Sequence, residues 1–388
     1  MKAVVLAAGK GRRLWPLTEI RPKPMLPVAN RPILEHVLEA LTQTDITEAL
    51  LIVGSNRDRI QSYFGDSYRD LSISYIVQEP QLGTGHALLQ AESSVGDSFV
   101  ALNGDRLIKP GLIDAVIERH ETTAEPTMAI TRTERPSRYG VVELTGQTVT
   151  GLTERPHSDH TTSNYVNAGV YAFSPEVFAA IRRLDTHGEQ ALTDALGTFI
   201  EEQRLEAVRY QGRWLDVSEP WDLLTVNQTL LDTQGKSVTD PETATIDESA
   251  VVRAATAIGD NAVIYPQTTV LRGVSIGNNV TVGAGVTLER AVLLDDVTIE
   301  HGAVVTDCIV GANTSIGPNT TVEGGCTDLV LEDRVYRDVT LGGLIGDNVT
   351  IGGNVTVRPG TIVGNDATID SGTSVVGRID DSSHVQGG

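Results

Sequence analysis

An aliphatic residue recurs at every sixth position through much of the second half of this 388-residue chain. The repeated residues are Ile258, Ile264, Val270, Ile276, Val282, Leu288, Val310, Ile316, Val322, Ile345, Ile351, Val357, Val363, Ile369 and Val375. Gly follows several of them directly, as in IGDNAV, IGNNVT and IGGNVT. A period of six predicts a parallel β-helix, because three such repeats make one triangular coil and point each aliphatic side chain inward.

The length of the repeat sets the size of this β-helix. Residues 246–378 would give about seven coils, and strands about 4.8 Å apart would make a prism about 34 Å long. Residues 289–309 and 323–344 break the register. We therefore expect a loop at each of these two places.

The first part of the chain has a different pattern. Apolar segments such as AVVLAA, EALLIVG, SISYIVQ and SFVALNG alternate with helix-like segments such as ILEHVLEALTQ and LIDAVIERH. This alternation predicts an α/β fold with a Rossmann-like, mainly parallel sheet and helices on both faces. Functional sites of such sheets lie at the carboxyl ends of the strands.

The two patterns divide the chain into parts. Residues 231–249 are polar and follow neither period, which indicates a connection. We expect a first domain over residues 1–232, a linker over 233–249 and a β-helix domain over 250–388.

Composition narrows the class of protein. The hydrophobic share is 40%, and no apolar run approaches the roughly 20 residues that cross a bilayer, so a soluble cytoplasmic protein without membrane contact is expected. The net charge of −21 argues against nucleic acid as a partner. Lys is scarce beside 51 acidic residues, which indicates either adaptation to a high-salt cytosol or ordinary drift. Cys308 and Cys326 form no metal-binding pattern, and both are expected to be buried.

The segment Leu6–Pro27, LAAGKGRRLWPLTEIRPKPMLP, concentrates positive charge in this acidic chain. It holds one acid, Glu19, and five basic residues: Lys10, Arg12, Arg13, Arg21 and Lys23. Gly9 and Gly11 follow the first expected strand, where glycine lets backbone N–H groups approach phosphate closely. The segment therefore predicts a polyphosphate site.

This segment resembles the nucleotide-binding signature of sugar-phosphate nucleotidylyltransferases, close to LAAGxGTRLxPLT followed by PKPMLPV. Arg12 stands where that family usually has Thr. The resemblance implies that Arg13 and Lys23 are catalytic and stabilise the charge that develops as pyrophosphate leaves. It also implies nucleotide contacts from Leu6, Ala7, Ala8, Gly9 and Gly11.

A second segment, QEPQLGTGHA at Gln78–Ala87, is similar to the base-recognition segment of the same family. The amide of Gln78 complements the N3–H and O4 edge of uracil or thymine, although adenine could also pair with it. The resemblance favours UTP or dTTP and implies that Gly83 and Thr84 close over the base.

Two aspartates end apolar segments in the expected sheet. Asp105 follows FVALNG and Asp216 lies in RWLDV, and both match metal positions of the family. Mg²⁺ is usually held by one or two carboxylates together with substrate oxygens and water, so Mg²⁺ is the expected cofactor. Arg106, directly after Asp105, is unusual for the family.

Sugar recognition rests on three shorter segments, RYGVVE, LTERP and NAGVYAF. By resemblance they supply Gly140, Glu154, Asn167 and Gly169 to the sugar pocket. Arg155 replaces the usual Lys of the family, and the two side chains hold phosphate differently.

The leading hypothesis is an enzyme that transfers UMP or dTMP to a sugar 1-phosphate, such as glucose 1-phosphate or N-acetylglucosamine 1-phosphate. In layout the chain is similar to bifunctional N-acetylglucosamine-1-phosphate uridylyltransferases, whose left-handed β-helix also transfers acetyl groups. That step uses a basic His, where this chain has Arg337; His301 lies in the context of a plain coil corner. A non-catalytic regulatory subunit is a third hypothesis. By resemblance, the β-helix assembles subunits into a homo-oligomer such as a trimer.

Overall fold

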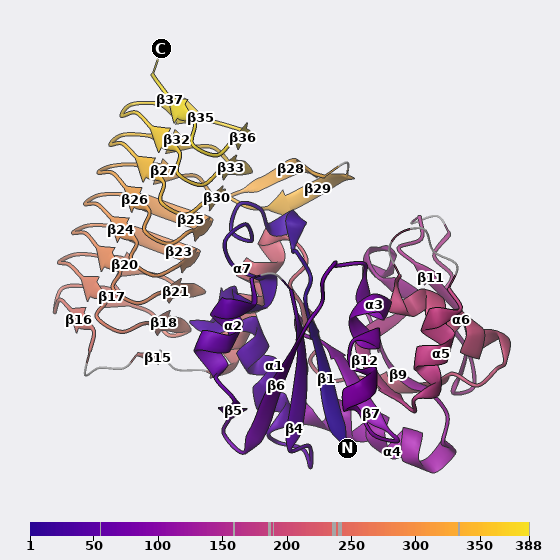
Figure 1. Ribbon diagram of the computed structural model, residues 1–388. Coiled ribbons are helices and arrows are strands. Elements are labelled where there is room, and N and C mark those ends of the chain that lie inside the picture. Colours follow the sequence, from indigo (N-terminus) through magenta and orange to yellow (C-terminus); the bar gives the residue numbers. More distant parts are fainter. Residues whose placement is uncertain are drawn as a thin grey trace. The chain divides into compact units, whose positions relative to one another are not determined.

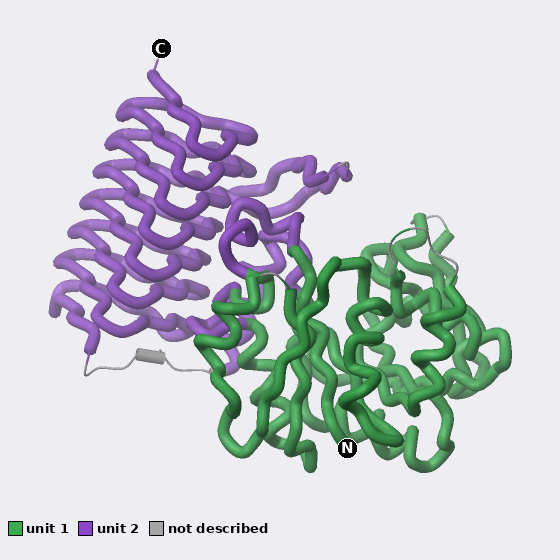
Figure 2. The backbone as a smooth tube through the Cα atoms, in the orientation of Figure 1, with its two compact units in different colours: residues 1–10, 22–25, 33–216 green, residues 11–21, 26–32, 217–388 purple. Residues whose placement is uncertain are grey.

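The computed structural model describes residues 1–54, 56–157, 160–184, 188, 190–234, 238–239, 243–332 and 334–387. The chain separates into two compact units (Figure 2). Unit 1 comprises Met1–Lys10, Pro22–Met25 and Ile33–Asp216, and unit 2 comprises Gly11–Arg21, Leu26–Pro32 and Val217–Gly388. Residues 235–237 and 240–242 of the expected linker lie outside the described residues. Within the described ranges, no helix has the length and apolar character needed to cross a membrane.

Unit 1 is built on a 10-stranded sheet in the order β10-β11-β13-β9-β12-β7-β1-β4-β6-β5 (Figure 1). Its strands are β1 (Lys2–Ala7), β4 (Glu48–Val53), β5 (Ser67–Tyr68), β6 (Leu71–Val77), β7 (Phe99–Asn103), β9 (Thr127–Arg132), β10 (Gly140–Thr145), β11 (Thr148–Glu154), β12 (Tyr165–Phe173) and β13 (Glu206–Tyr210). The short strands β8 (Arg106–Leu107) and β14 (Leu215–Asp216) pair beside it.

Helices cover both faces of this sheet because its central strands are apolar on both sides. In β1, Ala3 and Val5 pack into one core with α1 (Ile33–Leu41), α2 (Arg57–Phe64) and α4 (Pro110–Thr123). Val4, between them, packs into a second core. That second core contains residues of α3 (Thr84–Leu89), α5 (Glu176–Arg182) and α6 (Leu192–Glu201). The expected Rossmann-like α/β architecture is confirmed.

The sheet is mixed, which corrects the expectation that it is mainly parallel. Strands β6, β4, β1 and β7 run parallel to one another. Strand β12 is antiparallel to both of its neighbours β7 and β9. Strands β10 and β11 are antiparallel because a tight turn at Gly146, with φ +67°, joins them directly.

The repeats of unit 2 form parallel strands stacked in three columns, consistent with the expected left-handed β-helix (Figure 1). All of the aliphatic residues predicted to point inward lie in its core. The strands are β15 (Val238–Thr239), β16 (Thr245–Ile246), β17 (Val251–Val252), β18 (Thr256–Ile258), β19 (Val263–Ile264), β20 (Thr269–Val270), β21 (Val274–Ile276), β22 (Thr281–Val282), β23 (Thr287–Leu293), β24 (Thr298–Ile299), β25 (Val304–Val310), β26 (Ser315–Ile316), β27 (Thr321–Val322), β30 (Gly343–Ile345), β31 (Thr350–Ile351), β32 (Thr356–Val357), β33 (Thr361–Val363), β34 (Thr368–Ile369), β35 (Ser374–Val375), β36 (Arg378–Ile379) and β37 (His384–Val385). The coils thus continue past residue 378.

Two details of the β-helix differ from expectation. Residues 289–309 stay in the coil. Arg290 (φ +45°) lies at a corner within β23, and this corner contains one residue fewer than the corners of the regular six-residue repeat. Within residues 323–344, an antiparallel hairpin of β28 (Cys326–Leu331) and β29 (Arg334–Thr340) leaves the coil, and Gly343 and Leu344 belong again to a coil strand, β30. Cys308 is buried as expected, but Cys326 is exposed because it starts this hairpin.

Unit 2 also contains α7 (Pro220–Gln234) and the strands β2 (Pro27–Val28) and β3 (Arg31–Pro32). Asn227 of α7 is fully buried, and its Oδ1 accepts a hydrogen bond from Ala29 N at 2.7 Å and one from Ser275 Oγ at 2.7 Å. Helix α7 is therefore fixed to the β-helix and to the segment that contains β2.

Candidate active site

The parallel strands β6, β4, β1 and β7 bring their carboxyl ends to one edge of the sheet. Residues Leu6–Gly9 end β1, Gln78 follows β6 and Asp105 follows β7. Gly104 N donates a hydrogen bond to Leu6 O at 2.9 Å, and a Cβ on Gly104 would lie only 3.0 Å from that oxygen. Glycine is required here because the two strand ends approach so closely. The expected phosphate turn of unit 1 and Asp105 are thus direct neighbours.

The expected base-recognition segment folds against its own glutamine. The side chain of Gln78 is buried, its Nε2 donates to Gly83 O at 3.0 Å, and the same atom lies 2.9 Å from His86 Nδ1. Thr84 Oγ1 accepts a hydrogen bond from Leu192 N at 2.9 Å. In this state the hydrogen bonds of Gln78 and Thr84 hold the loop in place. To pair with a base, the amide of Gln78 must first release Gly83 O and His86.

Gln81 joins this loop to the phosphate turn. A Cβ on Gly54, which follows β4, would meet Gln81 Nε2 at 2.0 Å and Ala8 O at 3.0 Å. The Oε1 atom of Gln81 is buried and has no hydrogen-bond partner within the described part of the chain. A buried acceptor without a partner is costly, so this oxygen is available to a donor on a ligand.

Lys23 and Asp105 form an ion pair at the carboxyl end of β7. Lys23 Nζ donates to Asp105 Oδ2 at 2.5 Å, and Lys23 is buried in the short helix η2 (Lys23–Met25). Burial would raise the pKa of Asp105, but the charges of Lys23 and Arg106 outweigh it and lower that pKa to about 2. Asp105 is therefore a carboxylate at neutral pH.

Arg106 links the two predicted metal ligands. Its Nη1 contacts Asp216 Oδ1, and its Nε lies 3.7 Å from Asp105 Oδ1. Burial lowers the pKa of Arg106, but Asp216 and Asp105 together raise it above its usual value. The guanidinium also stacks on the rings of Trp214 (5.1 Å to the centroid) and Tyr139 (5.6 Å). Asp105 and Asp216 thus both pair with the guanidinium of Arg106.

The donors at this edge are of the type that Mg²⁺ prefers. Asp105 and Asp216 face a common cation, and one or two carboxylates are enough for Mg²⁺ when substrate phosphates complete its shell. Within the described residues no group of three or more His, Cys, Asp or Glu side chains gathers to hold a metal ion. The pair therefore fits a metal that arrives with a phosphate substrate.

The predicted sugar-binding residues gather on β10, β11 and β12. Gly140 is paired with Glu154, and a Cβ on Gly140 would lie 2.7 Å from Glu154 Oε2 and 3.6 Å from Asn167 Cβ. Asn167 Oδ1 accepts a hydrogen bond from Gly169 N at 3.0 Å. Burial raises the pKa of Glu154, and Arg155 and Arg106 oppose that shift.

Gly169 joins this cluster to the end of β7. Its φ is +77°, which favours glycine, and a Cβ there would lie 2.6 Å from Asn103 Nδ2 and 3.3 Å from Arg106 Cγ. The cluster of Gly140, Glu154 and Asn167 is thereby connected to the strand end that precedes Asp105.

Gly11 and Arg13 belong to unit 2 and have their described contacts there. Arg13 lies in the short helix η1 (Arg12–Leu14), which follows Gly11 in the left-handed conformation (φ +62°). Its Nη1 donates to Glu219 Oε1, and Glu219 is only 2% exposed. Tyr336 of the hairpin donates to the same oxygen at 3.2 Å. Arg13 is thus held by a buried carboxylate.

Comparison with known proteins identifies the family of this chain. The profile described as nucleotidyl transferase matches residues 2–233, which is more than half of the chain. The chain belongs to the nucleotidyl transferase family. The profile of the GMPPB C-terminal domain matches residues 234–340 of this nucleotidyl transferase, and that of the hexapeptide repeat of succinyl-transferase matches residues 344–376.

Relatives of this nucleotidyl transferase match nearly its whole length or a little under two thirds of it. The bifunctional protein GlmU of Methanococcus maripaludis is 33% identical and covers 99% of this chain and 97% of its own. The low-salt glycan biosynthesis nucleotidyltransferase Agl11 of Haloferax volcanii is 37% identical over 64% of this chain and 71% of its own. A solved structure from Bacillus anthracis, described as a candidate glucose-1-phosphate thymidylyltransferase, is 28% identical with a TM-score of 0.55, over 59% of this chain and 94% of that one.

Sequence reasoning about this nucleotidyl transferase missed several partners of its site residues. Glu219 lies only three residues after Asp216, in WLDVSEP, and an acidic residue so close to a predicted metal position was a usable signal. The role of Arg106 as a link between two carboxylates was not visible in the pattern. Tyr336 gave no signal, because its distance from Glu219 in sequence is 117 residues.

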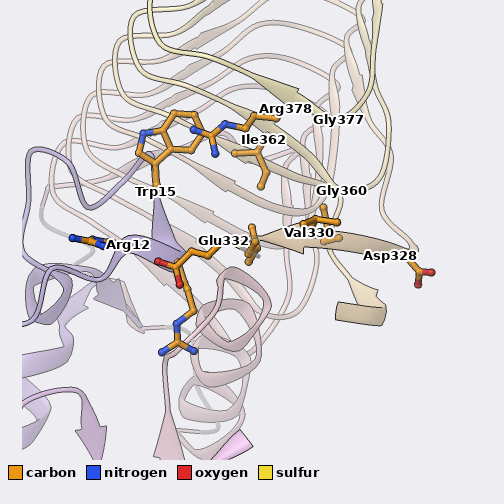
Figure 3. A pocket seen from close by; sticks show the side chains of 12 residues that line it. Arg12, Trp15, Asp328, Val330, Glu332, Gly360, Ile362, Gly377 and Arg378 are labelled. Carbon is orange, nitrogen blue, oxygen red and sulfur yellow. The ribbon is translucent and has the colours of Figure 1, made fainter. Parts of the chain in front are cut away.

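A cavity of about 360 Å³ lies in unit 2 beside Arg13 (Figure 3). Arg12, Trp15 and Arg378 line it together with apolar side chains of the hairpin and coils, such as Val330 and Ile362. The Arg378 guanidinium stacks on Trp15 at 3.8 Å from the ring centroid. Arg12, which departs from the family pattern, is thus one of the residues that line this cavity.

Proposed function

We propose that this nucleotidyl transferase moves UMP or dTMP from UTP or dTTP to a sugar 1-phosphate and releases pyrophosphate. The proposed acceptor is glucose 1-phosphate or N-acetylglucosamine 1-phosphate. A relative named glucose-1-phosphate thymidylyltransferase supports the first of these acceptors, and the resemblance in layout to bifunctional N-acetylglucosamine-1-phosphate uridylyltransferases supports the second. The reaction would supply nucleotide sugars for biosynthesis in the cytoplasm.

One observation carries the proposal: the phosphate turn and a charged Asp105–Lys23 pair end adjacent strands. Gly104 N bonds to Leu6 O at 2.9 Å, and Lys23 Nζ lies 2.5 Å from Asp105. A turn with backbone amides beside a cation and a carboxylate supports binding of a phosphate together with its counter-ion.

The proposed reaction is an in-line displacement at phosphorus. A phosphate oxygen of the sugar 1-phosphate attacks the α-phosphorus of the triphosphate, a new P–O bond forms, and the bond to the pyrophosphate oxygen breaks. Lys23 and Arg13 are the proposed catalytic cations, which bind the phosphates and offset the negative charge on the leaving group. The ion pair with Asp105 partly neutralises the positive charge of Lys23. A bound phosphate must therefore compete with the Asp105 carboxylate for Lys23.

The other proposed roles follow the positions of the side chains. Leu6, Ala7, Ala8, Gly9 and Gly11 would bind the nucleotide through the backbone, and Gln78, Gly83 and Thr84 would bind its base. Gly140, Glu154, Asn167 and Gly169 would line the sugar site, where Glu154 and Asn167 can bond hydroxyl groups.

Asp105 and Asp216 are the residues proposed to hold Mg²⁺. The ion would supply positive charge that screens the phosphates and polarises them toward attack.

We also propose the domain boundaries 1–232, 233–249 and 250–388 and a homo-oligomer, such as a trimer, assembled through the β-helix. Sedimentation of the full chain measures the number of subunits.

The direct test is pyrophosphate release with UTP and dTTP, each combined with glucose 1-phosphate and N-acetylglucosamine 1-phosphate, in the presence of Mg²⁺. We expect turnover with at least one pair and loss of turnover in Asp105→Ala. If no pair of nucleotide and sugar 1-phosphate supports turnover, and Asp105→Ala binds nucleotide as wild type does, the chain is a regulatory subunit and the proposal fails.

A second activity, acetyl transfer in the β-helix, is favoured by one observation: relatives named bifunctional protein GlmU match 99% of the chain. His301 is exposed at a coil turn, and its described charged neighbour is Glu300 at 3.9 Å. The test is release of free thiol from acetyl-CoA on addition of glucosamine 1-phosphate. A rate equal to that without the sugar excludes this activity.

A further inference from the structure

The loop segment, residues 11–21, carries Arg13 and is bound to the last coils of the β-helix within unit 2. Arg21 makes a two-pronged ion pair with Asp347, in which Nη1 and Nη2 each lie 3.0 Å from a carboxylate oxygen. Arg21 is 5% exposed and Asp347 is 1% exposed. A buried, two-pronged pair fixes both distance and orientation.

A second residue of the β-helix binds the same segment. Asn365 Nδ2 donates to Pro16 O at 3.2 Å and to Glu19 Oε2 at 3.0 Å. The Oδ1 atom of Asn365 accepts a hydrogen bond from Asp347 N at 2.8 Å. Asp347 and Asn365 therefore form one continuous surface for residues 16–21.

The loop segment is internally closed, so its two ends move together. Thr18 Oγ1 donates to Gly11 O at 2.9 Å, and Leu14 N donates to the same oxygen at 2.8 Å. Arg21 Nη1 also lies 3.3 Å from Leu17 O. Leu14 and Leu17 are fully buried. A displacement at Arg21 would therefore reach Arg13.

Two further contacts hold the middle of the segment. Trp15 stacks under Arg378 of β36 (Figure 3), and Arg13 is held by Glu219, to which the hairpin residue Tyr336 also donates. These contacts come from the β-helix, from the hairpin inserted in it and from Glu219, which directly precedes α7.

We propose that Asp347 and Asn365 are positioning residues for nucleotidyl transfer, which act by fixing the loop segment and so the place of Arg13. The inference rests on the proposed catalytic role of Arg13. It makes the last coils of the β-helix part of the machinery of the nucleotidyl transfer reaction, and not only an assembly surface.

The test uses full-length Asp347→Asn and Asn365→Ala. The matched control is Asp295→Asn, because Asp295 accepts a coil-to-coil hydrogen bond from Asn278 N at 2.8 Å, as Asp347 does from Ala312 N at 2.6 Å. We expect kcat for pyrophosphate release to fall about 10- to 100-fold in both variants, since small misplacements of a catalytic group have effects of this size. The KM for the sugar 1-phosphate and the activity of Asp295→Asn should stay unchanged.

A double-mutant cycle separates positioning from general damage. If Asp347 acts through Arg13, the double variant Arg13→Ala, Asp347→Asn is no slower than Arg13→Ala alone. If the losses of kcat from Arg13→Ala and Asp347→Asn add up in the double variant, the inference is overturned. It is also overturned if the wild type is active and the folded variants Asp347→Asn and Asn365→Ala keep its kcat. Circular dichroism at the assay temperature shows which variants are folded. If Asp347→Asn is unfolded, the test is made with Asn365→Ala. A wild type that releases no pyrophosphate with any pair overturns the proposed function itself, and this inference with it.

Discussion

Two arginines, one in each unit, pair with aspartates in different ways. Arg106 in unit 1 contacts Asp216 and Asp105, and the Asp105 side chain is still 24% exposed. Arg21 in unit 2 meets a single aspartate, Asp347, whose side chain is 1% exposed and also accepts from Ala312 N. The first arrangement leaves a face open to a ligand, and the second has no such opening. The open arrangement suits the proposed binding of a ligand, whereas the closed pair fixes the position of residues 11–21.

The largest effect is expected on stability when the closed pair is broken. Asp347→Ala leaves Arg21 buried without its carboxylate, and removal of one partner of such a pair costs about 3–5 kcal/mol. Urea unfolding of the full chain measures this loss. Arg21→Met combined with Asp347→Leu should recover most of it, since apolar side chains replace buried pairs well. A loss below about 1 kcal/mol in Asp347→Ala would contradict the description of this pair as closed.

Removing Lys23, the second cation that pairs with Asp105, should reduce the rate. In Lys23→Met the cation beside Asp105 is lost, and removal of one charge-stabilising group typically lowers kcat about 10²- to 10³-fold. Pyrophosphate release under saturating substrate measures the fall. The matched variant is Lys2→Met, which breaks the exposed pair with Glu48 and should keep wild-type kcat. Equal rates in both variants would contradict a catalytic Lys23.

A smaller effect is expected on binding of divalent ions. Arg106→Met removes the positive charge that faces Asp105 and Asp216, so these carboxylates should bind Mg²⁺ at least about tenfold more tightly. Titration calorimetry without substrate measures the affinity. Arg119→Met, which breaks the pair with Glu206 elsewhere in unit 1, is the control. If the affinity for Mg²⁺ is the same in the two variants, Asp105 and Asp216 do not hold the ion.

The smallest expected effect is on the pH dependence of unfolding. The pKa of Asp105 is lowered to about 2 from 3.8, so its stabilising contribution is complete above pH 3.8 and is lost as the pH falls through 2. Burial raises the pKa of Asp307, which Arg290 opposes. Stability from Asp307 therefore increases as the pH falls from 7 toward the unfolded value.

The free energy of unfolding from pH 7 to 4 distinguishes the two groups. Asp307→Asn should flatten part of the wild-type pH dependence over this range, whereas Asp105→Asn should leave its slope unchanged. The opposite result would show that the cations around Asp105 do not lower its pKa.

Sequence patterns were most informative where structure repeats or is local. The inward aliphatic residues from Ile258 to Val375 were predicted correctly, because a six-residue period is typical of a β-helix and places the repeated residue inside each coil. The neighbours Gly140, Glu154 and Asn167 were predicted by resemblance and lie together in the structure. The shortened corner at Arg290 and the hairpin after Glu323 were not predicted, since a break in a repeat does not say what replaces it.

Long-range partners were beyond the reach of the pattern. Arg21 was counted only as one of several phosphate-loop cations, and its ion pair with Asp347 spans 326 residues. A single sequence holds no signal for such a pair, because Asp347 occupies the same corner position as other aspartates, such as Asp295, which accepts a hydrogen bond from the preceding coil. Its contact with Arg21 depends on how the whole of unit 2 packs.

The ion pair of Arg21 and Asp347 has a consequence for the synthesis of the protein on the ribosome. A ribosome adds about 5–20 residues per second, so Asp347 is made roughly 15–65 s after Arg21. During that interval the first sheet can form, but the segment with Arg13 has no partner from the late coils. If Arg13 acts as proposed, the nascent chain is expected to gain nucleotidyl transfer only near the end of translation, and a premature stop before residue 347 would leave Arg21 without its partner Asp347.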